Sequence, residues 1–165
     1  MLKCFKAYDV RGEIGVDIDE DIAYRIGYAV AQHFDARSIV IGFDARETSP
    51  NFASAATKGA MKAGADVLDI GMAGTEEMYW AVTEFGACAG IEVTASHNPI
   101  NYNGMKIVKS GSKPLDDMMD FQVIKALVGS EDWVNSPRKG KLQNYASEAR
   151  AKYVDRVLGF IDVAQ

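Results

Sequence analysis

Segments with the apolar content of β-strands alternate with amphipathic helical segments along almost the whole chain. The strand-like segments are residues 38–43, 65–70 and 88–93, with a shorter one at 105–108 and a candidate edge strand at 4–8. Between them apolar residues recur at helical spacing, as Ile18, Ile22, Ile26, Val30 and Phe34 do. This alternation is typical of an α/β fold with helices on both faces of a sheet. We predict a three-layer α/β/α domain with a mixed, mostly parallel sheet of four main strands.

Local signals predict where the other helices begin and end. Ser49 and Pro50 are expected to be the N-cap and first-turn proline of a second helix, which Gly64 closes. Thr75 is expected to cap a third helix, and Gly86 to end it. Two further helices are predicted over residues 116–128, ended by a glycine, and over residues 146–161.

Composition narrows the function classes. At 165 residues with 48% hydrophobic and 25% charged residues, the chain is a globular domain and not a disordered segment. A net charge of -5 argues against sequence-independent binding of nucleic acid. No apolar run predicts a membrane span or a signal peptide. Cys4 and Cys88 leave a disulfide open, but reduced thiols are favoured, so we expect a cytoplasmic protein without nucleic-acid or membrane partners.

One strand exit carries an unusual set of reactive side chains. Residues 94–99 read Thr94-Ala95-Ser96-His97-Asn98-Pro99, directly after the strand at 88–93. Ligands of open α/β sheets bind at the carboxyl ends of strands, so this loop is a candidate site. An Asn103-Gly104 turn is expected to fold the chain back and bring Lys106 near the loop.

Two readings of that loop stay open on the residues alone. Every residue of Ser-His-Asn-Pro is a turn former, so it could be a plain surface turn. Alternatively it gathers a hydroxyl nucleophile, an imidazole and a cation for catalysis. A serine-hydrolase triad is disfavoured, because His97 is adjacent to Ser96 and no Gly-x-Ser-x-Gly elbow is present.

Arginines follow two other strands. Arg11 lies in Tyr8-Asp9-Val10-Arg11-Gly12, and Arg46 in Gly42-Phe43-Asp44-Ala45-Arg46. Each could clamp a phosphate or form an ion pair with its neighbouring aspartate. The glycine-containing segment 71–77 lacks the spacing of known phosphate loops and is interpreted as a strand-to-helix turn. His33 is interpreted as a packing or surface residue.

These motifs, in this order and together with Tyr102-Asn103-Gly104-Met105-Lys106, resemble the N-terminal phosphoserine domain of the α-D-phosphohexomutases. The resemblance runs from about Phe5 to the end of the chain. Within that family, Gly71-Met72-Ala73-Gly74-Thr75-Glu76-Glu77 is similar to the bacterial phosphomannomutases of GDP-mannose synthesis. The resemblance to the family also implies that the fourth strand runs antiparallel to the other main strands of the sheet.

The resemblance implies a mechanism and roles for residues. Ser96 would be a phosphoserine that exchanges its phosphoryl group with a hexose monophosphate through a hexose 1,6-bisphosphate. The resemblance places Arg11 and Lys106 around it, with Lys106 or His97 as general acid or base. It also implies that Tyr8 lines the substrate site and that Asn98 orients the loop, whereas Arg46 is expected to be structural.

The resemblance also implies parts that these residues do not supply. The family binds Mg²⁺ through the phosphoserine, here Ser96, and through three aspartates of a loop that does not occur in this sequence. Residues 1–145 would be domain I and residues 146–165 a helix leading to a missing domain II, so the chain alone is expected to be inactive. A stripe of Tyr153, Val157 and Leu158 should then be partly exposed or used in self-association.

Three alternatives remain beside a phosphomannomutase. Two belong to the same family, a phosphoglucomutase and a phosphoglucosamine mutase, since the residues that select the sugar lie in other domains. The third is a non-catalytic binding module that keeps the fold.

Overall fold

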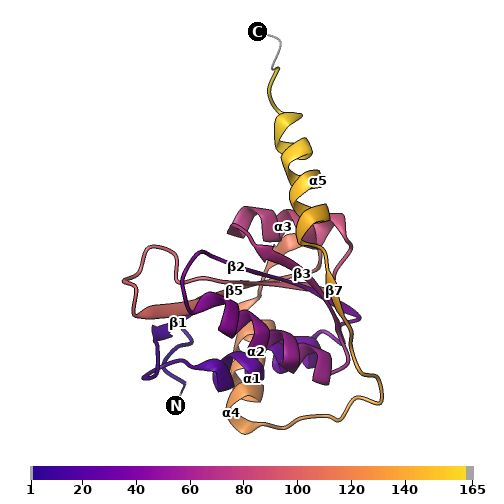
Figure 1. Ribbon diagram of the computed structural model, residues 1–165. Coiled ribbons are helices and arrows are strands. Elements are labelled where there is room, and N and C mark those ends of the chain that lie inside the picture. The colour runs from indigo at the N-terminus through magenta and orange to yellow at the C-terminus, as the bar shows by residue number, and fades with distance from the viewer. Residues whose placement is uncertain (1, 163–165) are drawn as a thin grey trace.

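A mixed sheet lies between two layers of helices in the computed structural model, which describes residues 2–162 (Figure 1). One face is covered by α1 (Glu20–His33), α2 (Ser49–Lys62) and α4 (Gln122–Ser130). The other face is covered by α3 (Thr75–Glu84) and the first turns of α5 (Ala146–Leu158). The three-layer α/β/α class predicted from the sequence is confirmed.

Over residues 2–162 the sheet has seven strands in the order β1-β5-β4-β2-β3-β7, with β6 paired to β5. Strands β2, β3, β4 and β7 run parallel, whereas β5 is antiparallel to β4, β1 and β6. The predicted four main strands are therefore its centre, and short strands extend it. The strands are β1 (Val10–Glu13), β2 (Ser38–Phe43), β3 (Asp66–Met72), β4 (Ala89–Val93), β5 (Tyr102–Lys109), β6 (Lys113–Pro114) and β7 (Leu142–Asn144).

Because helices cover both faces of the sheet, the central strands appear in the sequence as continuous apolar runs. In β2, Ile39 and Ile41 belong to the core under α1 and α2, whereas Val40 belongs to the core under α3. Parallel strands covered on both faces have this composition. None of the helices described over residues 2–162 is long and apolar enough to cross a lipid bilayer.

Two sequence predictions at the sheet edge were wrong. The edge strand is Val10–Glu13 rather than residues 4–8, and Phe5 makes only an isolated bridge to Val10. Asn103 and Gly104 do not form a turn but lie inside β5, opposite β1. A side chain at Gly104 would place its Cβ 2.1 Å from the Val10 carbonyl oxygen, so this glycine allows close strand approach.

Several predicted helix ends also move. Thr48, not Ser49, is the N-cap of α2, and Gly74, not Thr75, is the N-cap of α3. The fourth helical segment begins with a π-helical turn, Asp117–Phe121, and continues as α4 past Gly129. The last helix ends at Leu158 rather than at 161.

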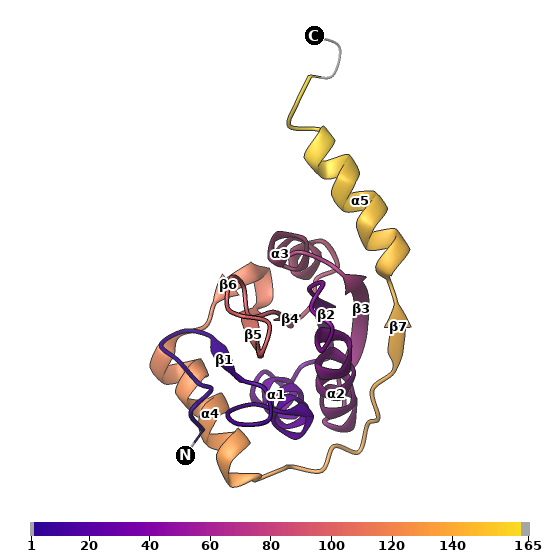
Figure 2. The ribbon, with the colours of Figure 1, turned by 60° about the vertical axis from the view of Figure 1, so that its left-hand side comes forward.

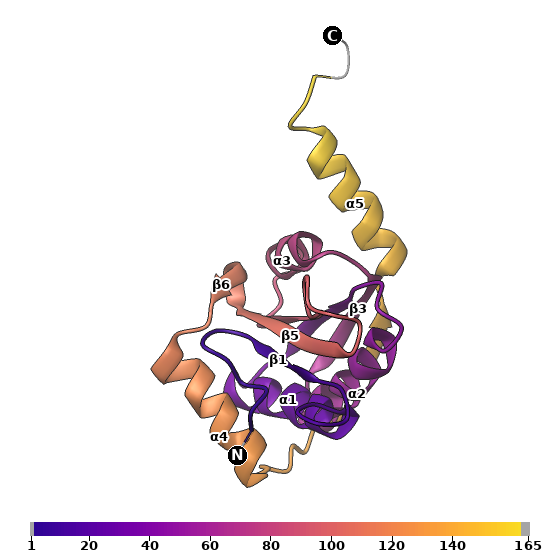
Figure 3. The ribbon, with the colours of Figure 1, turned by 90° about the vertical axis from the view of Figure 1, so that its left-hand side faces the viewer.

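Helix α5 points away from the domain, and only its first turns touch it (Figures 2 and 3). Ala149 is buried beside α3, and the Tyr153 ring lies 5.6 Å from that of Trp80. Further along, Val157 is 42% and Leu158 46% exposed. The predicted exposure of this stripe is confirmed.

A buried carboxylate ties α1, β5 and the π-helical turn together. Asp120 Oδ1 lies 3.0 Å from His33 Nε2, and Asp120 Oδ2 accepts a hydrogen bond from Lys109 Nζ at 2.6 Å. The Asp116 backbone N–H donates to the same oxygen. Burial raises the pKa of Asp120, but the hydrogen bonds from His33 and Lys109 outweigh it and lower the pKa to about 2. Of the packing and surface roles that the sequence left open for His33, the structure shows a packed position beside Asp120.

Asp120→Asn tests this network. Because the folded pKa lies below the ordinary value of 3.8, the carboxylate stabilises the fold above pH 4, and this stabilisation is lost as pH falls toward 2. We expect the substitution to cost about 2 kcal/mol at pH 7 and almost nothing near pH 2. Urea unfolding across that pH range measures it, and an equal cost at both ends would contradict the assignment.

Candidate functional site

The serine loop, residues 94–99, leaves the carboxyl end of β4 and carries Ser96 exposed to solvent. Ser96 has a φ of 54°, a left-handed conformation that is uncommon for a residue with a side chain. Its backbone N–H donates to Thr94 Oγ1 at 2.9 Å. The loop therefore holds an exposed serine in a strained backbone conformation.

Arg46 holds the serine loop through hydrogen bonds to its backbone. Its guanidinium donates to backbone carbonyl oxygens of Pro99 at 2.8 Å, Tyr102 at 3.1 Å, Ser96 at 3.0 Å and Asn98 at 2.6 Å. The Arg46 side chain is only 12% exposed. A planar group with fixed donors can hold several carbonyls at set directions, which a lysine cannot do. The expectation of a structural role for Arg46 came with the family resemblance and did not foresee these bonds.

A second layer of hydrogen bonds supports Arg46. Asp44 accepts from the Arg46 backbone N–H at 3.0 Å and from Ser49 Oγ at 2.6 Å, and lies 3.4 Å from Arg46 Nε. The buried Asn103 side chain donates to Thr48 Oγ1 and Ser49 Oγ and accepts from the Gly104 N–H. Sequence reasoning missed this network, because Asn103 was assigned to a turn.

Arg11 reaches the loop from the neighbouring strand β1. Its Nη1 donates to Asn98 Oδ1 at 2.9 Å, and its Nη2 pairs with Asp9 at 2.5 Å. The structure thus brings two predicted site residues, Arg11 and Asn98, into direct contact. Arg11 lies within a strand rather than in the loop where the sequence placed it.

The other predicted site residues lie around the same edge. His97 is exposed, with Nδ1 3.3 Å from Ser96 Oγ. Lys106 is half-buried on β5, directly opposite Glu92 of β4. Among residues 2–162 Lys106 forms no ion pair, so its charge is available to a ligand. Tyr8 is 78% exposed.

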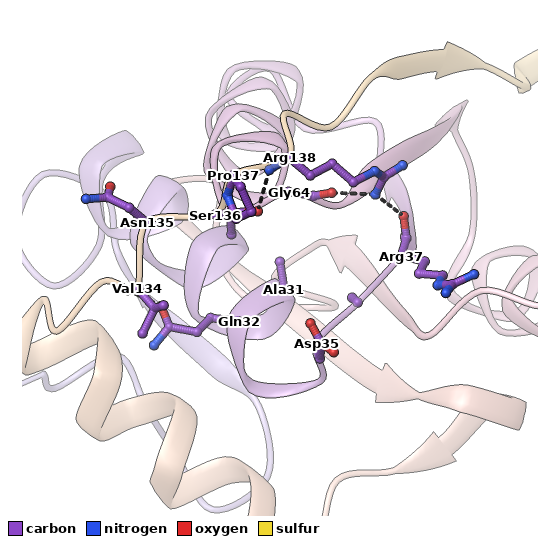
Figure 4. A pocket seen from close by; sticks show the side chains of 12 residues that line it. Ala31, Gln32, Asp35, Arg37, Gly64, Val134, Asn135, Ser136, Pro137 and Arg138 are labelled. Carbon is purple, nitrogen blue, oxygen red and sulfur yellow. Dashed lines mark hydrogen bonds between the residues drawn. The ribbon is translucent and has the colours of Figure 1, made fainter.

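A shallow cavity of about 430 Å³ opens beside the serine. It is lined by Asp44, Ala45, Arg46, Ser96, Asn98 and Ile100. A larger cavity of about 560 Å³ lies at the other end of the strands, where α1 and α2 end, between Gln32 and Arg138 (Figure 4). There the Arg138 guanidinium is already bonded to the Gly64 carbonyl oxygen and to Asp66. The chemistry therefore gathers at the smaller cavity.

The described residues do not form a complete metal site. Over residues 2–162 no cluster of three His, Cys, Asp or Glu side chains could hold a metal ion. Mg²⁺ needs several hard oxygen ligands. The serine hydroxyl alone would not meet that need.

The fold and the site define an α/β/α domain that presents one strained serine among cations. The family model for phosphoglucomutase/phosphomannomutase, alpha/beta/alpha domain I, matches residues 2–133. A phosphomannomutase of Escherichia coli is 46% identical over 99% of this chain and 36% of its own length. One of Klebsiella pneumoniae is 47% identical over 93% of this chain and 98% of its length.

Solved structures agree with the sequence matches. The crystal structure of a phosphoglucomutase/phosphomannomutase family protein from Burkholderia thailandensis superposes with a TM-score of 0.86 at 30% identity. It covers 100% of this chain and 37% of that one. The chain belongs to the phosphoglucomutase/phosphomannomutase family and is its N-terminal domain. It spans about a third of the length of the E. coli relative.

Arg46→Met tests whether the four hydrogen bonds from the Arg46 guanidinium hold the serine loop in place. Hydrogen bonds to a charged group contribute about 1.5–3 kcal/mol each when well formed, so losing four should destabilise the domain by at least about 2 kcal/mol. Amide hydrogen exchange at residues 94–102 should accelerate selectively. Arg37→Met removes an exposed arginine and serves as the control. Unchanged amide hydrogen exchange in the Arg46 variant would contradict this role of Arg46.

Ser96→Gly tests the strain at the serine. Glycine adopts positive φ at no steric cost, so this variant should be about 1 kcal/mol more stable than Ser96→Ala, which keeps the strain. Chemical denaturation of the two variants gives the difference directly. Equal stabilities would mean that the loop relaxes in solution to an ordinary conformation.

Proposed function

We propose that this chain is the phosphoserine domain of a phosphomannomutase, with Ser96 as the carrier of the phosphoryl group. The observation that supports this best is an exposed serine held at φ 54° in a loop whose carbonyls are bonded to Arg46. Phosphoryl transfer depends mainly on positioning and charge neutralisation. A serine fixed in this way, with Arg11 and Lys106 on the adjoining strands, suits that chemistry.

The proposed reaction has two transfers. The C1 hydroxyl oxygen of mannose 6-phosphate bonds to the phosphorus of phosphorylated Ser96 while the bond from phosphorus to Oγ breaks. A base takes the hydroxyl proton, and Ser96 Oγ regains a proton. The resulting mannose 1,6-bisphosphate turns over in the site and returns its 6-phosphoryl group to Ser96, which leaves mannose 1-phosphate.

Two side chains are candidates for the proton transfers. His97 Nδ1 lies 3.3 Å from Ser96 Oγ, within reach after a small rotation. Lys106 is the site cation without a carboxylate partner, whereas Arg11 is paired with Asp9 and Arg46 with Asp44. Among the described residues it is thus best suited to a developing negative charge or to a proton. Asn98 orients the loop through Arg11, and Tyr8 would line the sugar site.

The rest of the apparatus would come from outside this chain. Mg²⁺ would bind one oxygen of phosphorylated Ser96 and, when bound, neutralise charge on the transferred group. A hexose 1,6-bisphosphate would charge the serine initially. The exposed end of α5 would dock on the rest of the full-length protein, or pair with a second copy. We place the protein in the cytoplasm and its product in GDP-mannose synthesis.

Sugar selectivity is proposed from the relatives, since several that are 41–47% identical bear the name phosphomannomutase. A phosphoglucomutase or phosphoglucosamine mutase is the second candidate. It is favoured by a relative named for phosphohexose mutases in general, at 35% identity. A non-catalytic binding module is the third.

Ser96→Ala in the full-length protein tests the function. Turnover of mannose 1-phosphate should fall by at least about 10³-fold, because no carrier remains for the phosphoryl group. Ser54→Ala, an exposed serine on α2, should leave turnover unchanged. Rates with glucose and glucosamine phosphates separate the mutases. Undiminished turnover in the Ser96 variant would overturn the mechanism, and no turnover of any sugar by the unaltered protein would support the binding module.

A further inference from the structure

A buried carboxyl group lies on strand β4, four residues before Ser96. Glu92 is 0% exposed, and neither of its carboxyl oxygens has a hydrogen-bond partner among the described residues. It occupies the space that Gly42 leaves open, since a Cβ there would lie 2.5 Å from Glu92 Oε2. Buried polar groups without partners are rare and costly, so this one needs an explanation.

The surroundings of Glu92 make it an acid that resists ionisation. Burial first, and then the nearby carboxylates of Asp44, Glu77 and Glu76, raise the pKa of Glu92 to about 9. Glu77 is itself paired with Arg150 at 3.0 Å. The remaining titratable neighbour on α3 is Tyr79, whose pKa is raised by burial and then by the charges of Glu76 and Glu92.

One cation lies directly across from this group. Lys106 of β5 is the register partner of Glu92, and directly opposed residues of antiparallel strands point to the same face. Their Cβ atoms are about 5 Å apart in such pairs, well within the reach of a lysine side chain. Lys106 is half-buried and, among residues 2–162, forms neither a hydrogen bond nor an ion pair. A buried acid without a partner and an unpaired lysine thus occupy directly opposed positions on one face of the sheet.

We propose that Glu92 is a positioning residue for Lys106, an internal partner to which the lysine can turn across strands β4 and β5. The structure shows the separated arrangement, with the carboxyl over Gly42. Paired with the lysine, Glu92 would be ionised. When the lysine turns away, Glu92 would take up one proton from solvent and become neutral, so no uncompensated charge is left in the core.

The role in catalysis rests on the proposed function, whereas the pairing itself does not. While the two groups are paired, Glu92 would keep Lys106 protonated. A carboxylate beside a lysine favours the charged ammonium form and so raises the pKa of the lysine. The pair would therefore set the pH at which Lys106 can act as a base.

The pairing is tested without substrate, by carbon-13 NMR titration of the Glu92 carboxyl in this chain. Removing an opposite charge raises a carboxyl pKa, so Lys106→Met should raise that of Glu92 by about 1 unit or more. Lys125→Met, a half-buried lysine on α4, should leave it unchanged. The same Glu92 titration in the unaltered chain and in Lys106→Met would overturn the pairing.

A second measurement covers the case in which Lys106→Met does not fold. Isotope-labelled methyl groups are attached to the lysine amines, and NMR follows the titration of each. The Lys106 amine should titrate at lower pH in Glu92→Gln than in the unaltered chain. Glu92→Asp should restore the higher value in part. An unchanged Lys106 titration in Glu92→Gln would also overturn the proposal.

The pH profile of the full-length enzyme separates positioning from mere stability. In Glu92→Gln the limb of kcat/KM set by Lys106 should move to lower pH, and Glu92→Asp should restore it in part. A uniform loss at every pH would contradict positioning. If the titrations of Glu92 and Lys106 depend on each other but Ser96 transfers no phosphoryl group, the proposed mutase function is rejected and the Glu92–Lys106 pairing stands. If Ser96 transfers a phosphoryl group but the two titrations are independent, only the pairing is rejected.

Discussion

The site depends on the hydrogen bonds that the guanidinium of Arg46 donates to backbone carbonyl oxygens. Four backbone carbonyl oxygens converge on the guanidinium, three from the serine loop and one from Tyr102 at the start of β5. Because an irregular loop lacks the regular hydrogen-bond ladder of a sheet, its carbonyls need a donor set with fixed geometry. The guanidinium supplies it, and Ser96 is thereby kept in a left-handed conformation that a serine rarely adopts. Asp44, Ser49 and Asn103 in turn hold the arginine through the start of α2.

The distribution of charge around this loop is uneven. Arg11 and Arg46 are each close to an aspartate, so their charge is partly neutralised and their main service is directional hydrogen bonding. Lys106 is left without a carboxylate partner and faces a carboxyl group that burial keeps neutral. A net charge of -5 over the whole chain therefore coexists with a locally cationic edge. Local arrangement and not net charge determines what such an edge can bind.

Periodicity predicted the layers and the central strands well, because strands buried on both faces and helices with one apolar stripe leave clear patterns. It failed where tertiary contact decides. Asn103-Gly104 has the composition of a turn, yet Gly104 is needed for close approach to Val10 and Asn103 for buried hydrogen bonds. The reactive loop was recognisable from Ser96 and His97, but the reach of Arg46 to carbonyls some 50 residues away was not. Glu92 was visible only as a charge inside an apolar strand.

The central claim is that Ser96 carries a phosphoryl group, and mass spectrometry of the full-length protein tests it most directly. After incubation with mannose 1,6-bisphosphate, one added phosphoryl group should map to Ser96 by peptide fragmentation. Addition of mannose 6-phosphate to the isolated phosphoprotein should then remove it, with the label recovered on the sugar. A protein that stays unmodified at Ser96 under these conditions, with Mg²⁺ supplied, would contradict the account.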